Sequence, residues 1–150
     1  NHPRELTKVA RRACARFIDA GIPMLSQSVL LKGVNDDAAT LERLLRGLVE
    51  NRIKPYYLHH ADRAPGTAHF RTTLAAGQSL MEQVRGRLSG ICQPEYVLDI
   101  PGGAGKIPLG TSWAERTDDR YWRLRDYQGN EHRYCDVPDP GTEKPPDSGN

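Results

Sequence analysis

Hydrophobic and polar positions along the chain follow two periods in turn, one helical and one extended. Apolar residues spaced by three and four positions predict amphipathic helices at residues 5–20, after Asp37 and after a cap at Thr72 or Thr73. Short apolar runs bounded by turn residues predict strands at 24–32, 53–60 and 94–99. Because helices and strands alternate with short connections, the pattern is typical of βα units around a parallel sheet. The predicted fold class is therefore α/β.

The segment after Asp37 has the most regular helical pattern. Its apolar positions recur at i, i+3, i+4, i+7 and i+8, as Leu41, Leu44, Leu45, Leu48 and Val49. Candidate N-caps precede it at Asn35, Asp36 and Asp37, while Gly21 and Pro23 end the first helix and Gly90 ends the third. The pattern therefore sets the limits of each predicted helix.

Polar residues follow the predicted strands at positions where such folds gather their functional side chains. Gln27 lies within the first strand, Asp62 just past the second and Asp99 at the end of the third. In parallel sheets, the carboxyl ends of the strands lie at one edge and form the usual binding site. Either aspartate alone also suits a turn or a helix cap.

The C-terminal part of the chain has a different pattern. Two alternating segments, Tyr121–Tyr127 and His132–Cys135, flank Gln128-Gly129-Asn130 and predict a β-hairpin. Pro, Gly and charged residues dominate 137–150 and predict a disordered tail. We therefore expect three parts, with boundaries at 1–110, 111–136 and 137–150.

Length and charge exclude several classes of protein. The 150 residues suit one domain, but the chain opens on Asn1-His2-Pro3 without a methionine, so we expect a fragment that lacks an N-terminal part. The net charge is only +2 and no basic stripe is interleaved with aromatics, which argues against nucleic-acid binding. No apolar run is long enough to span a membrane, and no secretory signal is present.

The three cysteines have no metal-binding or disulfide pattern. Cys14, Cys92 and Cys135 are odd in number, far apart and never spaced as CxxC. Free thiols in a reducing cytoplasm are the expectation, with no metal ligands among the residues of this chain.

A glycine-rich turn between two prolines is the most distinctive stretch. Gly102, Gly103 and Gly105 follow Pro101 and deliver Lys106 at the exit of the turn. Glycine lets the backbone adopt positive φ or approach a ligand closely. The stretch suits a bound anion or a covalently modified lysine, and equally a mobile surface loop. A nucleotide P-loop is excluded, since Ile100 replaces the first glycine and Ile107 the Mg²⁺-binding Ser or Thr.

Several stretches together resemble the C-terminal half of lysine 2,3-aminomutases, radical S-adenosylmethionine enzymes that also use pyridoxal phosphate. They keep order and spacing over residues 1–135: Asn1-His-Pro-Arg-Glu-Leu, Gln27-Ser-Val-Leu-Leu-Lys-Gly-Val-Asn-Asp36, Pro55-Tyr-Tyr-Leu-His-His-Ala-Asp62, His69-Phe-Arg71, Ser89-Gly90 and Leu98-Asp-Ile-Pro-Gly-Gly-Ala-Gly-Lys-Ile-Pro108. The resemblance implies a fragment of the family's partial (β/α) barrel with parallel strands.

The resemblance also assigns roles in the glycine-rich turn. Lys106 would hold pyridoxal phosphate as an internal aldimine, and the glycines Gly102, Gly103 and Gly105 would let the backbone pass close to that cofactor. The family usually has a fourth glycine where Ala104 stands here, which is a mild departure because alanine is the smallest replacement.

Two aspartates fall where the family binds the far ammonium of its substrate L-lysine. These are Asp62 and Asp99. A buried ammonium requires carboxylates in good geometry, and two of them would repel a glutamate side chain. We also expect both carboxylates to converge on one cavity that Lys106 shares, and expect a raised pKa in this unpaired pair.

Two further residues lie near the implied cofactors. Gln27 matches a residue expected near S-adenosylmethionine, with a structural amide as the equal alternative. His59 could line the pyridoxal phosphate pocket or simply pack, and His60 should point to the other face of a regular strand.

Two features of the family are absent from these residues. The CxxxCxxC that binds its [4Fe–4S] cluster does not occur, and neither does the cysteine-rich zinc site of some members. We therefore expect the cluster ligands outside this chain, no structural zinc, and no activity from the chain alone.

The resemblance implies a cytoplasmic isomerase that interconverts L-lysine and β-lysine and forms homo-oligomers in the intact enzyme. This chain would be its pyridoxal phosphate- and substrate-binding half. A related aminomutase that serves translation elongation factor modification is one alternative, although it is expected to carry glutamate at the position of Asp99. A non-catalytic remnant that binds a partner protein is the other.

Overall fold

The computed structural model describes residues 1–136. The predicted disordered tail, 137–150, lies outside the described residues. The chain separates into two compact units, Asn1–Thr111 and a second unit that begins at Ser112, and each is described by itself.

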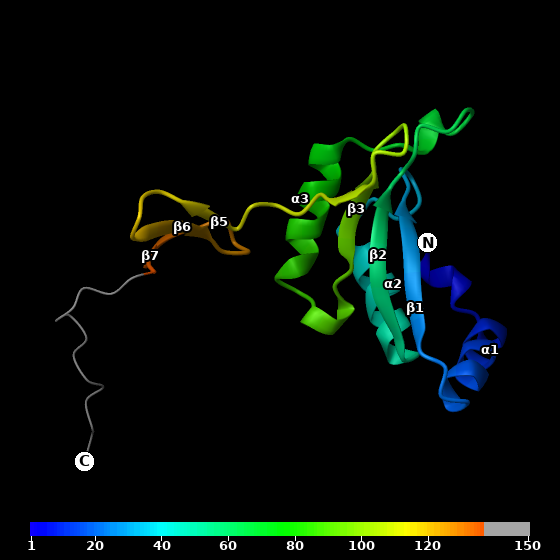
Figure 1. Ribbon diagram of the computed structural model, residues 1–150. Helices are drawn as coiled ribbons and strands as arrows, with labels where there is room; N and C mark the ends of the chain where they lie inside the picture. Colours follow the sequence, from blue (N-terminus) through cyan, green and yellow to red (C-terminus); the bar gives the residue numbers. More distant parts are fainter. Residues whose placement is uncertain (137–150) are drawn as a thin grey trace, which may run out of the picture. The chain divides into compact units, whose positions relative to one another are not determined.

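A four-stranded sheet forms the centre of the first unit (Figure 1). Strands β1 (Met24–Leu30), β2 (Ile53–His60) and β3 (Glu95–Asp99) are parallel, and the short β4 (Lys106–Pro108) runs antiparallel beside β3. The order of strands along the sheet is that of the sequence, β1-β2-β3-β4. The α/β class and the parallel strands predicted from the pattern are therefore confirmed.

The three predicted helices are present and begin at side-chain caps. They are α1 (Lys8–Asp19), α2 (Ala38–Glu50) and α3 (Leu74–Arg85), with short 3₁₀ turns at Pro3–Glu5, Ala68–Phe70 and Gly90–Cys92. Thr7, Asp37 and Thr73 each accept a hydrogen bond from a backbone N–H of the first turn. The hydrogen bonds from Thr40 hold the pKa of Asp37 below its usual value.

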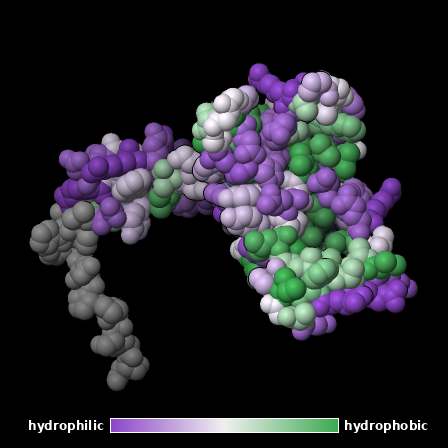
Figure 2. Space-filling view, turned by 45° about the vertical axis from the view of Figure 1, so that its right-hand side comes forward, coloured by the Kyte–Doolittle hydropathy of each residue, from purple (hydrophilic) through white to green (hydrophobic). Residues whose placement is uncertain are grey.

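The hydrophobic core lies between α2, α3 and the sheet. Leu41 and Leu45 of α2, Leu58 of β2 and Val84 of α3 are each at most 1% exposed. By contrast α1 has no fully buried residue, and Phe17 is 55% exposed. Apolar side chains gather on one part of this unit's surface (Figure 2). The amphipathic pattern therefore predicted each helix correctly, although it did not show how deeply each would be buried.

The sheet is open, and no barrel closes within residues 1–136. Closing a barrel needs more tilted strands than these four, three of which are parallel. No helix among these residues is long and apolar enough to cross a membrane.

The glycine-rich turn is a tight connection between two paired strands rather than a free loop. Gly102, Gly103 and Gly105 all have positive φ, between 80° and 103°. The N–H of Ile100 donates to the carbonyl of Gly105 at 2.8 Å. Lys106 therefore begins β4 and lies directly opposite Asp99 of β3, a pairing that the sequence pattern did not predict.

The second unit is an antiparallel sheet of three strands. Strands β6 (Tyr121–Arg125) and β7 (Glu131–Cys135) form the predicted hairpin, which is confirmed. A third strand, β5 (Ala114–Arg116), pairs with β6 and was not predicted. Its three residues are too few for the alternation to be visible in the sequence.

Candidate active site

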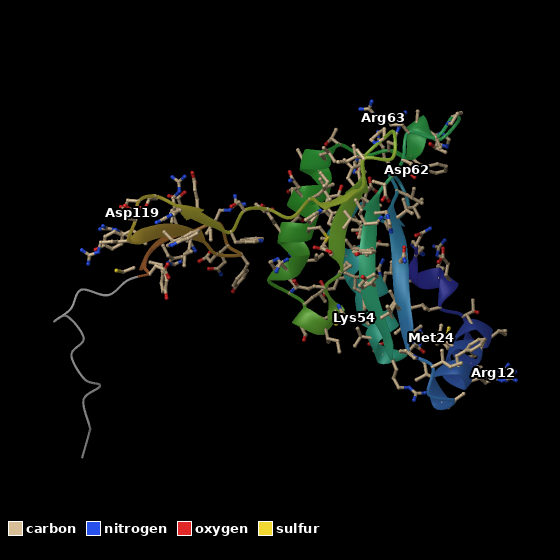
Figure 3. The ribbon with its side chains drawn as sticks, in the orientation of Figure 1. Arg12, Met24, Lys54, Asp62, Arg63 and Asp119 are labelled. Carbon is tan, nitrogen blue, oxygen red and sulfur yellow. The ribbon has the colours of Figure 1, made fainter. Side chains whose placement is uncertain are left out.

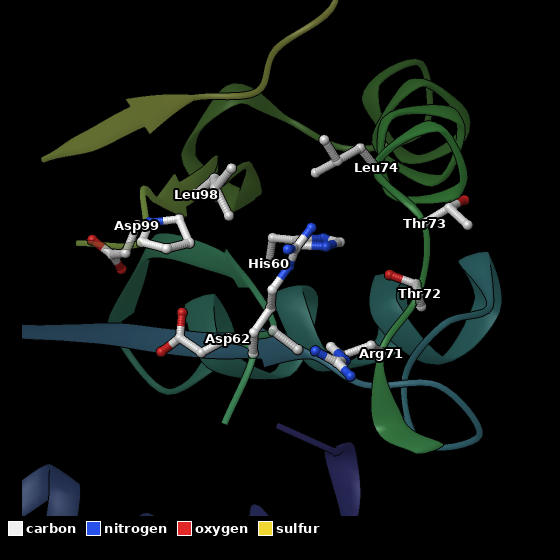
Figure 4. A pocket seen from close by; sticks show the side chains of 11 residues that line it. His60, Asp62, Arg71, Thr72, Thr73, Leu74, Leu98 and Asp99 are labelled. Atoms are coloured by element: carbon white, nitrogen blue, oxygen red, sulfur yellow. The ribbon is translucent and has the colours of Figure 1, made fainter. Parts of the chain in front are cut away.

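A cavity of about 750 Å³ opens beside the carboxyl ends of β2 and β3 (Figure 4). Three segments line it, namely the end of β2 with the residues after it, the start of α3 with the residues before it, and the end of β3 with the turn: His60, Ala61, Asp62, Arg63, Arg71, Thr72, Thr73, Leu74, Leu98, Asp99 and Pro101. Figure 3 shows Asp62 and Arg63 at the opposite end of the sheet from Met24 and Lys54, which lie near the strand starts.

The two predicted aspartates come together at this edge. Asp62 and Asp99 line the large cavity, and both line a second one of about 320 Å³ with Gln27, Val29, His59 and His60. Their carboxylates lie on the same side of the large cavity (Figure 4). The expected convergence of the two aspartates is therefore found, because β2 and β3 are parallel neighbours whose ends lie side by side. Lys106, which was expected to share their cavity, is not among the residues that line either one.

The charge state of this pair differs from the expectation. The ammonium of Lys106 donates to both carboxylate oxygens of Asp99 at 2.7 Å. This hydrogen bond, more than any other contact, lowers the pKa of Asp99, so the predicted rise in pKa is wrong for this residue. The chain supplies its own cation, because the β3–β4 pairing places Lys106 across from Asp99. Asp62 has no hydrogen-bond or ion-pair partner among residues 1–136.

His59 links side chains from all four strands. Its Nδ1 lies 3.2 Å from Asp99 Oδ2 and 3.4 Å from Lys106 Nζ, and its Nε2 lies 3.0 Å from Gln27 Oε1. Lys106 Nζ also lies 5.4 Å from the centre of the Tyr57 ring, within the range of a cation–π contact. Gln27, His59, Asp99 and Lys106 thus come from β1, β2, β3 and β4, and we call this set the four-strand cluster.

The neighbouring histidine faces away from that cluster, as strand alternation predicted. His60 Nδ1 lies 2.7 Å from the hydroxyl of Tyr96. Burial lowers the pKa of His60 and raises the pKa of Tyr96 to about 12. A Cβ at Gly77 of α3 would lie 2.0 Å from that hydroxyl, so α3 can pass over Tyr96 only at a glycine. In the sequence, the indication of this contact was Gly77 itself, because glycine is unfavourable inside a helix.

The start of α3 adds a polar end to the large cavity that sequence reasoning missed. Arg71, Thr72 and Thr73 line it there, and the buried hydroxyl of Thr72 has no hydrogen-bond partner in the described part of the chain. In the sequence, the one indication of this polar end was the pair of threonines, Thr72 and Thr73, that predicted a helix cap.

The geometry fits a cofactor that bonds covalently to a lysine. The Lys106 side chain is 33% exposed, and its amine lies against His59 and Asp99, two residues that line the smaller cavity. A Cβ at Gly102, Gly103 or Gly105 would meet no atom within 4 Å, so the turn borders open space. The structure therefore leaves room at Lys106, although no contact in it assigns these glycines a ligand.

Comparison with known proteins identifies the relatives of this chain. The lysine-2,3-aminomutase family model matches residues 81–147. A putative L-lysine 2,3-aminomutase of Aquifex aeolicus is 46% identical over 81% of the chain and 33% of its own length. L-lysine 2,3-aminomutase of Acetoanaerobium sticklandii is 43% identical over 86% of the chain and 31% of its own length. Glutamate 2,3-aminomutase of Clostridioides difficile is 37% identical over 92% of the chain and 33% of its own length. The chain thus spans about a third of the length of these relatives.

Proposed function

Because the chain is homologous to the C-terminal part of lysine 2,3-aminomutases, we propose that it forms the substrate-binding part of an enzyme that interconverts L-lysine and β-lysine. The four-strand cluster beside the cavities is the observation that carries this proposal, since it holds one lysine amine against the carboxylate of Asp99, beside a cavity that Asp62 also lines. The open sheet would then be part of a larger (β/α) barrel completed by residues outside this chain.

Lys106 is the residue proposed to hold pyridoxal phosphate. The amine projects beside the exposed glycine-rich turn, where Gly102, Gly103 and Gly105 leave space for the cofactor. When bound, this cofactor supplies a conjugated π-system that stabilises charge or an unpaired electron beside the migrating nitrogen. The residues of the chain then have to position the substrate and keep the amine of Lys106 reactive.

Asp62 and Asp99 are proposed to bind the side-chain ammonium of the substrate. Asp62 has no cationic partner of its own within the described residues, and Asp99 holds the ammonium of Lys106. Once that amine is used in binding the cofactor, Asp99 is available for another cation. Two carboxylates at one cavity repel a negatively charged side chain, which favours lysine over glutamate as the substrate.

S-adenosylmethionine and the [4Fe–4S] cluster are proposed to be held largely by residues outside this chain. Within residues 1–136, no group of three His, Cys, Asp or Glu side chains is placed to bind a metal ion. Gln27 and His59 are proposed to line the cofactor region, because both border the smaller cavity. Free thiols at Cys14, Cys92 and Cys135 agree with the proposed cytoplasmic location.

The test is to trap the cofactor on its lysine. We expect the chain to develop an imine absorption band with pyridoxal phosphate, and borohydride to fix the adduct on Lys106. Peptide mapping of the reduced adduct decides the outcome, and Lys106→Met is the matched control. Recovery on Lys32 or Lys54 instead would remove the basis of the proposal.

Substrate choice needs the natural protein that contains this chain. Lysine 2,3-isomerisation should be lost in Lys106→Met and strongly reduced in Asp62→Asn. The glutamate 2,3-aminomutase similarity makes glutamate the second candidate substrate, and turnover of glutamate in place of lysine would favour it.

A further inference from the structure

The imidazole of His59 contacts three functional groups of the four-strand cluster at once. Nδ1 faces both Asp99 Oδ2 and Lys106 Nζ, at 3.2 Å and 3.4 Å, while Nε2 faces Gln27 Oε1 at 3.0 Å. The side chain is only 18% exposed, so the ring has little freedom to turn. Each ring nitrogen therefore has a defined partner, which restricts where its proton can lie.

The contact with Gln27 determines the tautomer of the neutral ring. An amide oxygen only accepts hydrogen bonds, so the Nε2 atom of His59 that faces it carries the proton. The other nitrogen, Nδ1, then has a lone pair. Of the two atoms that face Nδ1, only Lys106 Nζ carries hydrogens, and the neutral ring therefore accepts a hydrogen bond from the ammonium.

Asp99 faces one cation both before and after a proton moves from Lys106 to His59. With a lysine ammonium and a neutral ring, Asp99 pairs with Lys106 at 2.7 Å. When the proton moves, one N–H bond of Lys106 breaks and leaves its electron pair on Nζ. The lone pair of His59 Nδ1 forms the new N–H bond, which can donate to Asp99. The carboxylate faces one cation in both states, and the summed charge of the three groups stays at zero.

We propose that His59 accepts the proton that turns the ammonium of Lys106 into a free amine, and that Gln27 positions the ring for this transfer. This proton transfer rests on the proposed function, in which Lys106 bonds to the carbonyl carbon of the cofactor. Attack of a lysine on a carbonyl requires the neutral amine. Other titratable groups near the cluster are Tyr57, which lies under the Lys106 amine, and Asp62, which shares the smaller cavity. The pKa of Tyr57 is raised, so its phenol stays neutral when the lysine loses a proton.

Competitive acetylation measures the free amine directly. The full chain is treated with trace acetic anhydride between pH 6 and pH 10, and mass spectrometry compares Lys106 with the exposed amines of Lys8 and Lys32. We expect labelling of Lys106 at pH 7 to fall several-fold in His59→Gln. Asp99 still favours the ammonium in that variant, while the proton acceptor is gone.

Two further variants separate the relay from a general effect of histidine loss. Gln27→Leu should lower Lys106 labelling by less than His59→Gln, because the acceptor is present but its tautomer is no longer fixed. His132→Gln, which removes the histidine of a His–Asp pair in the second unit, should leave Lys106 labelling unchanged. Equal labelling of Lys106 in the unaltered chain and in His59→Gln would overturn the proposal.

Nitrogen-15 NMR of the His59 ring provides a readout that does not depend on lysine chemistry. In its neutral form, the ring should show the Nε2–H tautomer in the unaltered chain and a mixture of tautomers in Gln27→Leu. A predominant Nδ1–H tautomer in the unaltered chain contradicts the relay. Neither measurement uses pyridoxal phosphate, so failure of cofactor trapping on Lys106 would refute the proposed function while leaving the relay standing.

Discussion

Each of the two units of the chain is stabilised internally by a different kind of interaction. The first unit buries a continuous apolar core between α2, α3 and the parallel strands. In the second unit, no residue of 112–136 is buried, and its side chains meet in exposed ion pairs and cation–π contacts. Burial of apolar area stabilises strongly, whereas exposed ion pairs contribute about 0–1 kcal/mol each.

The difference explains where the candidate site lies. A reactive amine and two carboxylates have to be held in fixed positions, which requires rigid strands over a packed core. The four-strand cluster stands on strands whose other side chains, such as Leu58 and Val97, are at most 1% exposed. The second unit offers no such support within its described residues.

The largest expected effect is a cavity in the core of the first unit. Leu58→Ala should lower the free energy of unfolding by about 2–5 kcal/mol, because this side chain is 0% exposed. Every helix of the described chain lies in the first unit, and both tryptophans, Trp113 and Trp122, lie in the second. Circular dichroism at 222 nm in urea should therefore report the loss, while tryptophan fluorescence reports the other unit.

Leu124→Ala, in a half-buried position of β6, is the matched control. It should shift the tryptophan transition by less than about 1 kcal/mol and leave the helix signal unchanged. If Leu58→Ala shifted both signals equally, the two units would unfold as one, and the comparison between them would fail.

The next effect concerns the close approach of α3 to β3. Gly77→Ala should destabilise the first unit by about 1–3 kcal/mol, because the new methyl group would lie 2.0 Å from the Tyr96 hydroxyl. Gly90→Ala is the control, since a Cβ there meets nothing within 4 Å. Urea unfolding of both variants measures the difference, and equal stability would show that α3 shifts freely.

Alkaline pH should weaken the first unit through the same tyrosine. Burial raises the pKa of Tyr96 from 10.0 to about 12. Its stabilising contribution is complete below pH 10 and is lost as the pH rises through 12, with a total of about 3 kcal/mol. Unfolding free energies measured from pH 9 to pH 12 should fall in the unaltered chain and fall less in Tyr96→Phe. Parallel curves would assign the loss to other groups.

The smallest effect is expected in the second unit at acidic pH. Hydrogen bonds from His132 and then Asn130 hold the pKa of Asp126 well below its usual value. Its contribution is complete above the unfolded pKa of about 4 and disappears as the pH falls through the lower folded value. At pH 6, Asp126→Asn should therefore slightly lower the free energy of unfolding that tryptophan fluorescence reports, and added salt should reduce this difference. Asp119→Asn, at a side chain that is 99% exposed, should change it less.

The sequence alone determined the helices, the parallel strands and the hairpin of this protein. Periodicity and capping are local properties, because a helix face or a strand face is set by residues a few positions apart. Placement of Asp62 and Asp99 at one edge also followed, since parallel neighbours bring their carboxyl ends together.

Only the tertiary structure decided the chemistry of that edge. The pairing of Lys106 with Asp99 depends on a turn that reverses the chain into β4, and the pattern predicted a loop there. The links from His59 to Gln27 and from Tyr96 to His60 join residues 32 and 36 positions apart. Such contacts depend on strand register and on which side chains meet across neighbouring strands, and residue spacing along the chain carries neither.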